Sequence, residues 1–579
     1  MNRAPEPRLL ERRLYVAMAL LLAAIWLAGL GARPLFNPDE GRYAEIPREM
    51  LERGDWIIPH LNGLEYLEKP PLQYWATALS FRWFGLNAFA ARLYSALCAF
   101  GTVALCWAMA RRLGGPRCAW RAAAMLSGMM IFCVLGHLLT LDMSLTFYLT
   151  LSLTCFLLAQ TGGAPTMGPP TIGPPPAGRY WMLCAWVAAA LGVMTKGIVA
   201  AAIPAAVFVA YSLWTRDFSA WRRLQLPLGI VLFLVIAVPW HWLAARRDGD
   251  FLEFYFVHEH LARYLTPVAQ RVQPWWFFLP VFVAGTAPWS LSALRVVAVG
   301  WRRTGGPGTG GPREPGGGFD APLFLWIWVV FIVVFFSLSD SKLMPYILPV
   351  MPAVAVAAAL APLQVRRREY LVTAILTLIV GAGLCVASSM WPRVLASSDR
   401  AAYFLPLGKT AAQVAAVLIV AAVLALVQRG RDETRACVLL GTGWCLAWMW
   451  IGVDAACIAP VYSGVELARA IRADEAGTDA QGARAHAPPL YSVATYDQTL
   501  EFYLERTATL VQYRGELDYG LRKHPGADIA DLREFERRWM GDPAGYAIME
   551  FPTFEKLRAD GLPMRVIGRS VGELVAARP

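Results

Sequence analysis

A chain of 579 residues of which 57% are hydrophobic carries more apolar sequence than the core of a soluble globular protein requires, so most of it is expected to lie in lipid. The net charge of +11 does not indicate a nucleic-acid-binding protein, because Lys and Arg are concentrated in short loops where they are typical topology signals. The ten Cys residues lie within or beside apolar segments, so no disulfide framework is implied, and no metal-ligand spacing such as CxxC appears.

About thirteen apolar segments are each long enough to cross a membrane, for which a helix needs roughly 20 residues. They are 13–32, 88–110, 118–137, 141–160, 179–195, 197–214, 225–245, 276–299, 321–338, 343–362, 370–391, 407–428 and 435–457. Arginine-rich loops alternate with mixed or acidic loops along the chain, which predicts a cytoplasmic N-terminus and a C-terminal region on the opposite, outer side. The first segment shows no small-residue cleavage site, so we expect a retained signal anchor.

Two Gly/Pro-rich runs, 162–178 and 305–318, are typical of flexible linkers and lack the lysine of a phosphate-binding loop. After about residue 460 the composition becomes that of a soluble domain. Short β-like runs at 490–495, 508–513, 546–550 and 564–568 are separated by helical segments at 497–505 and 529–539. We therefore predict a mainly α, multi-pass membrane domain over 1–459, with a first outer loop over about 33–87, and a small α/β domain over 460–579.

The segment 36–50, FNPDEGRYAEIPREM, places the adjacent carboxylates Asp39 and Glu40 just past the first apolar segment. Asn37 as N-cap, Pro38 at the first helical position and Glu40 three residues after the cap form an ordinary helix start. Apolar residues then recur with a helical period, which predicts an amphipathic helix along the membrane surface. On the local sequence, a capping role and a catalytic role for these acids are equally supported.

Ionisable residues gather in the predicted outer loops, where charges beside apolar spans are costly and tend to mark function. These loops contain Asp39, Glu40, Glu65, Glu68, Lys69, Asp142, Lys196, His258, Glu259, His260, Arg263, Asp340, Ser341, Lys342 and Tyr346. A ring of charges at one face of the membrane suits a substrate that is itself half lipid.

Several of these residues also have a purely structural explanation. Lys69 and Lys342 are long enough to extend their ammonium groups to the membrane interface, and His258 and His260 are also explained as surface residues. Asp142 is harder to explain as a helix cap alone, because an acid in so short a turn is forced close to the hydrocarbon.

A metal site is a further alternative on the same side. The sequence HEH is not the HExxH motif of zinc proteases. A loosely held divalent ion, Zn or Mg, shared by Glu68, His258 and His260 stays open as an interpretation.

Several motifs follow one another along the chain: NPDEGRYAEIPREM, LEKPPLQYW, LTLDMSLTF, MTKG, SDSKLMPYILP and YSVATYDQTLEFYLERTATLVQYRGELDYGL. In this order they resemble the bacterial 4-amino-4-deoxy-L-arabinose transferases of lipid A, within the GT-C, protein-mannosyltransferase-like class. The resemblance implies a monomeric inner-membrane enzyme with a GT-C fold, thirteen spans and a periplasmic C-terminal domain. It also implies transfer of aminoarabinose from undecaprenyl phosphate to a lipid A phosphate, giving resistance to polymyxin and other cationic peptides.

By this resemblance, a set of polar residues is expected to bind the two lipid substrates. The set is Lys69, Arg263, Lys196, Lys342, Tyr346 and Glu68. Lys69 and Arg263 are expected to hold the donor phosphate, with Lys196 and Lys342 as helpers. Cations suit this place because the leaving phosphate develops negative charge.

Asp39 and Asp142 are the expected catalytic residues, and their role depends on the acceptor. A lipid A phosphate is already ionised at pH 7, so the carboxylates would orient it or bind the ammonium group of the sugar. A hydroxyl acceptor would instead require Asp39 to remove a proton. We expect direct, inverting displacement with no cofactor required.

Two other functions are open on the sequence. The first is another GT-C enzyme that uses a polyprenyl-phosphate sugar with a different sugar or acceptor. The second is a transporter of lipid-linked sugars. Transporters tend to place charges near the membrane midplane and to contain internal repeats, whereas these charges lie at one face and no repeat is evident.

Overall fold

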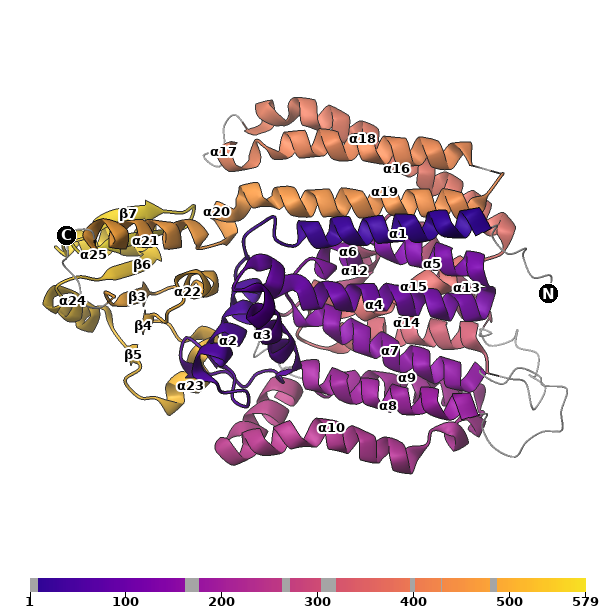
Figure 1. The fold of residues 1–579 in the computed structure, drawn as a ribbon, viewed down its shortest axis with the longest axis horizontal. Coiled ribbons are helices and arrows are strands. Elements are labelled where there is room, and N and C mark those ends of the chain that lie inside the picture. The colour runs from indigo at the N-terminus through magenta and orange to yellow at the C-terminus, as the bar shows by residue number, and fades with distance from the viewer. Residues whose placement is uncertain are drawn as a thin grey trace.

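The computed structural model describes residues 9–161, 176–262, 271–303, 319–395, 401–428, 430–479 and 487–579. Long helices lie side by side in a bundle, and a smaller domain that contains a sheet adjoins one end of it (Figure 1). Helices α2 (Asp39–Arg53) and α3 (Leu72–Phe84) of the first long loop lie between these two parts. The prediction of a mainly α protein with a C-terminal α/β domain is confirmed.

Each of the predicted apolar segments coincides with one helix or with two consecutive helices. The bundle helices are α1 (Leu9–Gly29), α4 (Ala88–Gly114), α5 (Pro116–Gly128), α6 (Met130–Gly136), α7 (Leu141–Thr161), α8 (Pro176–Lys196), α9 (Val199–Thr215), α10 (Leu226–Arg247), α12 (Phe278–Gly285), α13 (Ser290–Arg303), α14 (Ala321–Leu338), α15 (Met351–Ala359), α16 (Leu363–Leu395), α18 (Leu407–Val427) and α19 (Glu433–Asp454). In the described residues, seven helices are long and apolar enough to cross a membrane, or eight if the bent pair α5–α6 is one span. The chain is thus a multi-pass membrane protein, while thirteen spans stay a prediction.

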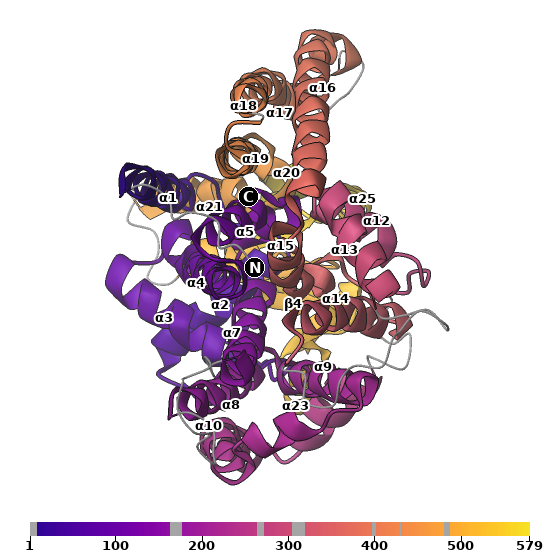
Figure 2. The ribbon, with the colours of Figure 1, turned by 90° about the vertical axis from the view of Figure 1, so that its right-hand side faces the viewer.

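The bundle is not equally compact throughout. Helices α16 and α18 extend away from the remaining helices and pack mainly on each other and on α19 (Figure 2). Much of the surface of α16 is apolar and exposed, as expected for a helix that faces lipid.

Two predicted spans are broken, and the two breaks contact each other. Helices α5 and α6 are bent by 69° after Gly128, which packs on the main chain of Gly441. The segment between α12 and α13 contains Pro288, which cannot donate a main-chain hydrogen bond. The N–H of Met130 donates to the carbonyl of Ala287 over 3.0 Å, so each break satisfies the other's main chain. Hydropathy alone does not register either break.

The first long loop forms α2, the hairpin of β1 (His60–Leu61) and β2 (Leu64–Glu65), and α3. Asn62 and Gly63 both have positive φ, as a two-residue hairpin turn requires. Helix α2 forms where a helix was predicted, but residues 40–50 are buried because α3 and α22 (Gln498–Leu504) pack against it. The expected exposed polar face of this helix is therefore covered by the C-terminal domain.

The C-terminal domain contains a sheet with the strand order β5-β4-β3-β6-β8-β7. Its strands are β3 (Leu490–Val493), β4 (Thr509–Val511), β5 (Asp528–Ile529), β6 (Tyr546–Glu550), β7 (Arg565–Arg569) and β8 (Glu573–Ala577). Strands β3 to β6 pair in parallel, whereas β8 is antiparallel to β6 and β7. The sequence predicted four of these strands and missed the short β5 and the terminal β8.

Helices cover both faces of this sheet because its strands alternate their apolar side chains between two cores. Tyr491 and Val493 of β3 pack with α24 (Leu532–Gly541) and α25 (Phe551–Ala559). Leu490, one residue earlier, packs on the other side with α21 (Val465–Asp479) and α22. The second face is the one that brings α22 against α2, and thereby joins the domain to the bundle.

Candidate active site where the bundle meets the C-terminal domain

Three of the predicted site residues come together at this end of the bundle. Asp142 lies in the first turn of α7, and Lys196 is the last residue of α8. Lys196 forms an ion pair with Asp142, and its Nζ lies 5.2 Å from the ring centroid of Tyr346 in the 3-10 helix Met344–Val350. Only 14% of the Asp142 side chain and 17% of the Lys196 side chain are exposed. A cation so shielded from water interacts strongly with an anionic group.

A second lysine–carboxylate pair joins the first loop to the segment after α10. Lys69 Nζ donates to Glu259 over 2.8 Å and to the main-chain carbonyl of Glu68 over 2.9 Å. Within the described part of the chain, these bonds use two of the three N–H groups of the ammonium. Glu259 belongs to the π-helix Glu253–Ala262, and π-helical turns are rare and frequent at functional sites.

Asp39, the first residue of α2, is the more open of the two predicted catalytic acids. Its side chain is 53% exposed and lies 3.3 Å from the guanidinium of Arg42. Arg42 is largely buried and also forms an ion pair with Glu516 of the C-terminal domain. Asp39 is therefore linked to that domain through one arginine.

The charges of both Asp39 and Asp142 act on the hydroxyl of Tyr43. The Tyr43 side chain is buried on α2, and burial, followed by the charges of Asp39, Glu68 and Asp142, raises the pKa of its hydroxyl. The charges of these three carboxylates therefore all act on the Tyr43 hydroxyl. The direct contacts among the predicted site residues are those of Lys196 with Asp142 and Tyr346, and that of Lys69 with Glu68.

Polar groups without a protein partner line the same region. The hydroxyls of Tyr66 and Tyr74 and the amide nitrogen of Gln73 are buried and have no hydrogen-bond partner among the described residues. The rings of Tyr43 and Tyr74 lie 6.2 Å apart. A buried donor without a partner costs about 1–3 kcal/mol, so such a group usually serves a ligand or an ordered water.

Glu40, in contrast, has a structural role. The sequence predicted only a partner for the helix cap, whereas Glu40 joins several segments through buried ion pairs. It is buried and forms ion pairs with Arg33 over 2.6 Å and with Arg92 of α4 over 2.7 Å. Burial alone would raise the pKa of Glu40, but the two guanidinium groups outweigh it and lower the pKa to about 2. Glu40 also accepts the N–H of Leu139, so it ties α2 to the turn that carries Asp142.

The predicted helix start is partly wrong. Pro38 occupies the N-cap position of α2 without a side-chain cap, so Asn37 is not the cap. The side chain of Asn37 accepts the N–H of Thr499 over 3.0 Å, at the start of α22 in the C-terminal domain. Glu40 does reach back to a main-chain N–H, four residues earlier. A local pattern cannot reveal that a remote helix uses the cap residue.

Lys342 is not brought into contact with the described site carboxylates. Its ammonium donates to the main-chain carbonyl of Ser339. Its main-chain N–H donates to the main-chain carbonyl of Arg271 over 3.1 Å. Lys342 is buried and stabilises the turn after α14. Its expected role as a phosphate-binding helper has no geometric support in this structure.

The remaining predicted residues lie in or beside the π-helix. His258 is half exposed and lies 3.5 Å from Glu259. The side chain of His260 and all of Arg263 lie outside the described residues. Within the part of the chain that the structure describes, no three His, Cys, Asp or Glu side chains converge to hold a metal ion. The ammonium of Lys69 lies next to Glu68 and Glu259, where such an ion would have been expected.

Three residues of this region were not assigned a role from the sequence. Glu259 was noted only as a member of the outer ring, although an acid between two histidines in an outer loop is itself a signal. Arg42 and Glu516 were not singled out, because their ion pair joins segments more than 450 residues apart. Only the tertiary structure reveals that pairing.

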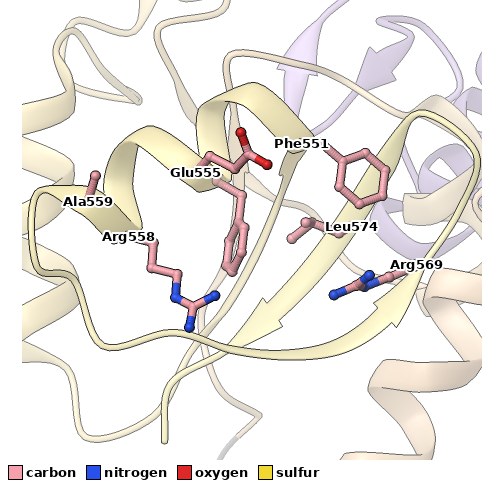
Figure 3. A pocket seen from close by; sticks show the side chains of 7 residues that line it. Phe551, Glu555, Arg558, Ala559, Arg569 and Leu574 are labelled. Atoms are coloured by element: carbon pink, nitrogen blue, oxygen red, sulfur yellow. The ribbon is translucent and has the colours of Figure 1, made fainter.

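A separate hollow lies in the C-terminal domain beside α25, β7 and β8 (Figure 3). It has a volume of about 490 Å³ and is lined by Phe551, Phe554, Glu555, Arg558, Ala559, Arg569 and Leu574. None of the predicted site residues lines it. The candidate active site is therefore the polar region around Tyr43 and not this hollow.

Two family models match parts of the chain. Residues 479–578 match the aminoarabinose transferase C-terminal domain, and residues 13–255 match dolichyl-phosphate-mannose-protein mannosyltransferase. The first match covers most of the α/β domain. The second covers the bundle from α1 to α10, including Asp39, Lys69, Asp142 and Lys196.

Curated proteins are also similar. The undecaprenyl phosphate-alpha-4-amino-4-deoxy-L-arabinose arabinosyl transferase of Pseudomonas savastanoi pv. phaseolicola is 35% identical over 339 residues, which are 57% of this chain and 58% of that protein. The protein of the same name from Pseudomonas aeruginosa is 32% identical over 343 residues, 58% of each chain. The chain thus aligns with less than two thirds of the length of these relatives.

A solved structure is similar over nearly the whole length. The crystal structure of ArnT from Cupriavidus metallidurans bound to undecaprenyl phosphate has a TM-score of 0.84 and 31% identity, covering 97% of each chain. The apo structure of the same protein has a TM-score of 0.83 and 32% identity, again over 97% of each chain. Together with the match of its C-terminal domain, this shows that the chain belongs to the aminoarabinose transferase family.

Proposed function

We propose that this protein is a membrane glycosyltransferase that moves 4-amino-4-deoxy-L-arabinose from undecaprenyl phosphate to a phosphate of lipid A. The named relatives are undecaprenyl-phosphate aminoarabinose transferases, and the solved relative binds undecaprenyl phosphate. Cells that make the proposed product should resist cationic peptides. Adding an amino sugar to an anionic phosphate lowers the negative charge of the membrane to which these peptides bind.

The observation that carries the proposal is the pair of shielded lysines beside carboxylates, Lys69 with Glu259 and Lys196 with Asp142. A phosphate entering this region takes the free N–H of Lys69 and competes with Asp142 for Lys196. As the glycosidic bond breaks, negative charge grows on the leaving phosphate, and pre-positioned cations stabilise it. Arg263, in the segment after the π-helix, is proposed as a third cation.

The reaction we propose is a single inverting displacement. An oxygen of the lipid A phosphate attacks the anomeric carbon, the bond from that carbon to the donor phosphate breaks, and undecaprenyl phosphate leaves with the electron pair. The attacking phosphate is already ionised at pH 7, so no general base is needed. Asp39 and Asp142 then serve to orient the acceptor and to bind the ammonium of the sugar.

The unpartnered polar groups around Tyr43 support a sugar at this position. The hydroxyls of Tyr66 and Tyr74 and the amide of Gln73 offer hydrogen bonds to sugar hydroxyls. The half-exposed carboxylate of Asp39 favours a cationic substituent on the sugar over a neutral one. A site with buried polar groups discriminates strongly against a ligand that leaves them unpaired.

The remaining features of the proposal concern the protein as a whole. We propose a monomer with a cytoplasmic N-terminus and a periplasmic C-terminal domain in the bacterial inner membrane. We also propose that lysines supply the positive charge, with no metal required. The other option, Zn or Mg held by Glu68, His258 and His260, predicts loss of activity on treatment with a chelator and recovery on adding the ion.

A second candidate is transfer to a hydroxyl acceptor by the same site. The match of residues 13–255 to a protein mannosyltransferase model favours it, because the name of that model indicates a protein acceptor. A protein hydroxyl must lose its proton when it attacks the sugar. The half-exposed Asp39 would then be the general base.

Mass spectrometry of lipid A separates the two candidates. Cells that express the protein together with an aminoarabinose donor pathway should show lipid A species heavier by one pentosamine, and cells without it should not. The product should have the opposite anomeric configuration to the donor. Lipid A of unchanged mass, a covalent glycosyl-enzyme, or retained configuration would each contradict the proposal.

A further inference from the structure

The C-terminal domain forms hydrogen bonds with Asn37, two residues before Asp39. The N–H of Asn37 donates to the carbonyl of Tyr462 over 2.7 Å, and its side-chain oxygen accepts the N–H of Thr499 over 3.0 Å. The same N–H of Thr499 also donates over 2.9 Å to the buried Asp497, the N-cap of α22. Asn37 is thus a member of the capping network of a helix in another domain.

The same helix start contacts the chain immediately after Asp39. A Cβ built on Gly41 would lie 2.6 Å from Thr499 N and 2.7 Å from the carbonyl carbon of Gln498. Real Cβ atoms do not approach main-chain atoms this closely, so only glycine permits the contact. The main chain of α2 therefore rests directly on the main chain of α22.

A third contact reaches the carboxylate itself. Arg42 forms ion pairs with Asp39 and with Glu516, and Glu516 also accepts a hydrogen bond of 2.7 Å from the amide of Gln498. Arg42 is largely buried, so its guanidinium has little freedom to take another position. The C-terminal domain thus holds the residues at 37, 41 and 42, on both sides of Asp39.

From these contacts we infer that the C-terminal domain sets the position of Asp39 in the active site, with Asn37 and Gly41 as positioning residues. The inference rests on the proposed role of Asp39 in glycosyl transfer. Asp39 is half exposed, and it is the first residue of α2, so its place depends on where the helix begins. A displacement of about 1 Å at a reacting group can lower the rate by roughly 100-fold.

Gly41→Ala tests the inference. Alanine favours a helix over glycine, so α2 itself should be stabilised, while the new methyl group pushes α22 away. We expect kcat to fall at least about 10-fold, with the affinity for undecaprenyl phosphate unchanged, because the lysines are not moved. Gly477→Ala is the matched control, since Gly477 lies in helix α21 of the same domain with open space around its Cα. It should keep the wild-type kcat.

A second variant and a second readout keep the two proposals separable. Asn37→Ala should also lower kcat while leaving KM within about twofold of the wild type. If Gly41→Ala does not fold, Asn37→Ala alone tests whether the C-terminal domain positions Asp39. Hydrogen–deuterium exchange of residues 37–42 should be faster in both variants. Wild-type protein that transfers no pentosamine would refute the proposed function alone. Unchanged kcat in both variants, a change in KM only, or wild-type exchange over 37–42 would overturn the inference, whatever the acceptor.

Discussion

The two acids of the proposed site lie in regions that are built in different ways. Asp142 belongs to the bundle, where Lys196 from the next helix and the ring of Tyr346 enclose it. Asp39 belongs to the junction of two domains, where it is half exposed and pairs with Arg42, which also pairs with Glu516 of the C-terminal domain. The acid of the bundle is thus held in a shielded ion pair, whereas the acid of the junction is half exposed. We propose that the donor phosphate binds at the ion pair and that the second lipid substrate enters at the junction.

The two regions are joined by Glu40, and removing its charge should have the largest effect on stability. Glu40→Gln leaves Arg33 and Arg92 buried without a full counter-charge, which should destabilise the protein by about 3–5 kcal/mol. Thermal unfolding in detergent measures this. Glu52→Gln, a change to a 61% exposed acid on the same helix, should cost less than about 0.5 kcal/mol. Equal melting temperatures for the two variants would show that Glu40 does not join the regions.

Within the bundle region, Lys196 should matter most for catalysis. Lys196→Ala removes a cation from the developing charge and leaves Asp142 largely buried without its partner, so kcat/KM should fall by about 100- to 1000-fold. Lys196→Arg should restore part of the loss. Lys556→Ala, at an exposed position on α25, should leave kcat/KM unchanged. If Lys196→Ala keeps kcat/KM within threefold of the wild type, the donor phosphate does not bind at the Lys196–Asp142 pair.

The junction should differ from the bundle in its response to pH. Glu501 of α22 is buried, accepts a hydrogen bond from Tyr496 over 2.6 Å and faces Glu45 of α2. Burial first, and then the charge of Glu45, raise the pKa of Glu501. The folded protein therefore holds a proton that the unfolded chain loses above about pH 4.5, so stability falls as pH rises from there towards the raised pKa.

A glutamine in place of Glu501 should remove this pH dependence. Glu501→Gln resembles the protonated acid, so it should raise the melting temperature by about 2–5 °C at pH 8 and change it little at pH 5. Glu555→Gln, at an exposed position in the same domain, should have no effect at either pH. A lower melting temperature for Glu501→Gln at pH 8 would mean that Glu501 is ionised in the folded protein.

Features that depend on local composition could be predicted from the sequence. Apolar segments of sufficient length identified the bundle helices, and alternating β-like runs identified four strands of the sheet. Asp142, Lys196 and Tyr346 were found because each is a polar residue at the end of an apolar segment, and such ends meet at one face of a membrane bundle.

Features that depend on distant partners could not be predicted. The pattern Asn-Pro-Asp-Glu reads as a helix cap, but Asn37 accepts the N–H of Thr499, more than 450 residues away, and Glu40 binds Arg92 in another helix. The breaks after Gly128 and at Pro288 depend on a main-chain hydrogen bond between two spans. The sequence supplies the residues for these contacts but not the pairing between them.

The role of Asp39 is the central claim, and lipid A mass spectrometry on Asp39→Asn and Asp39→Ala tests it most directly. Asp250→Asn, which changes a 79% exposed acid, is the control. We predict that the pentosamine-modified lipid A falls at least about 100-fold in rate of formation in both Asp39 variants and is unchanged in the control. Full modification of lipid A by both Asp39 variants would contradict this account of the active site.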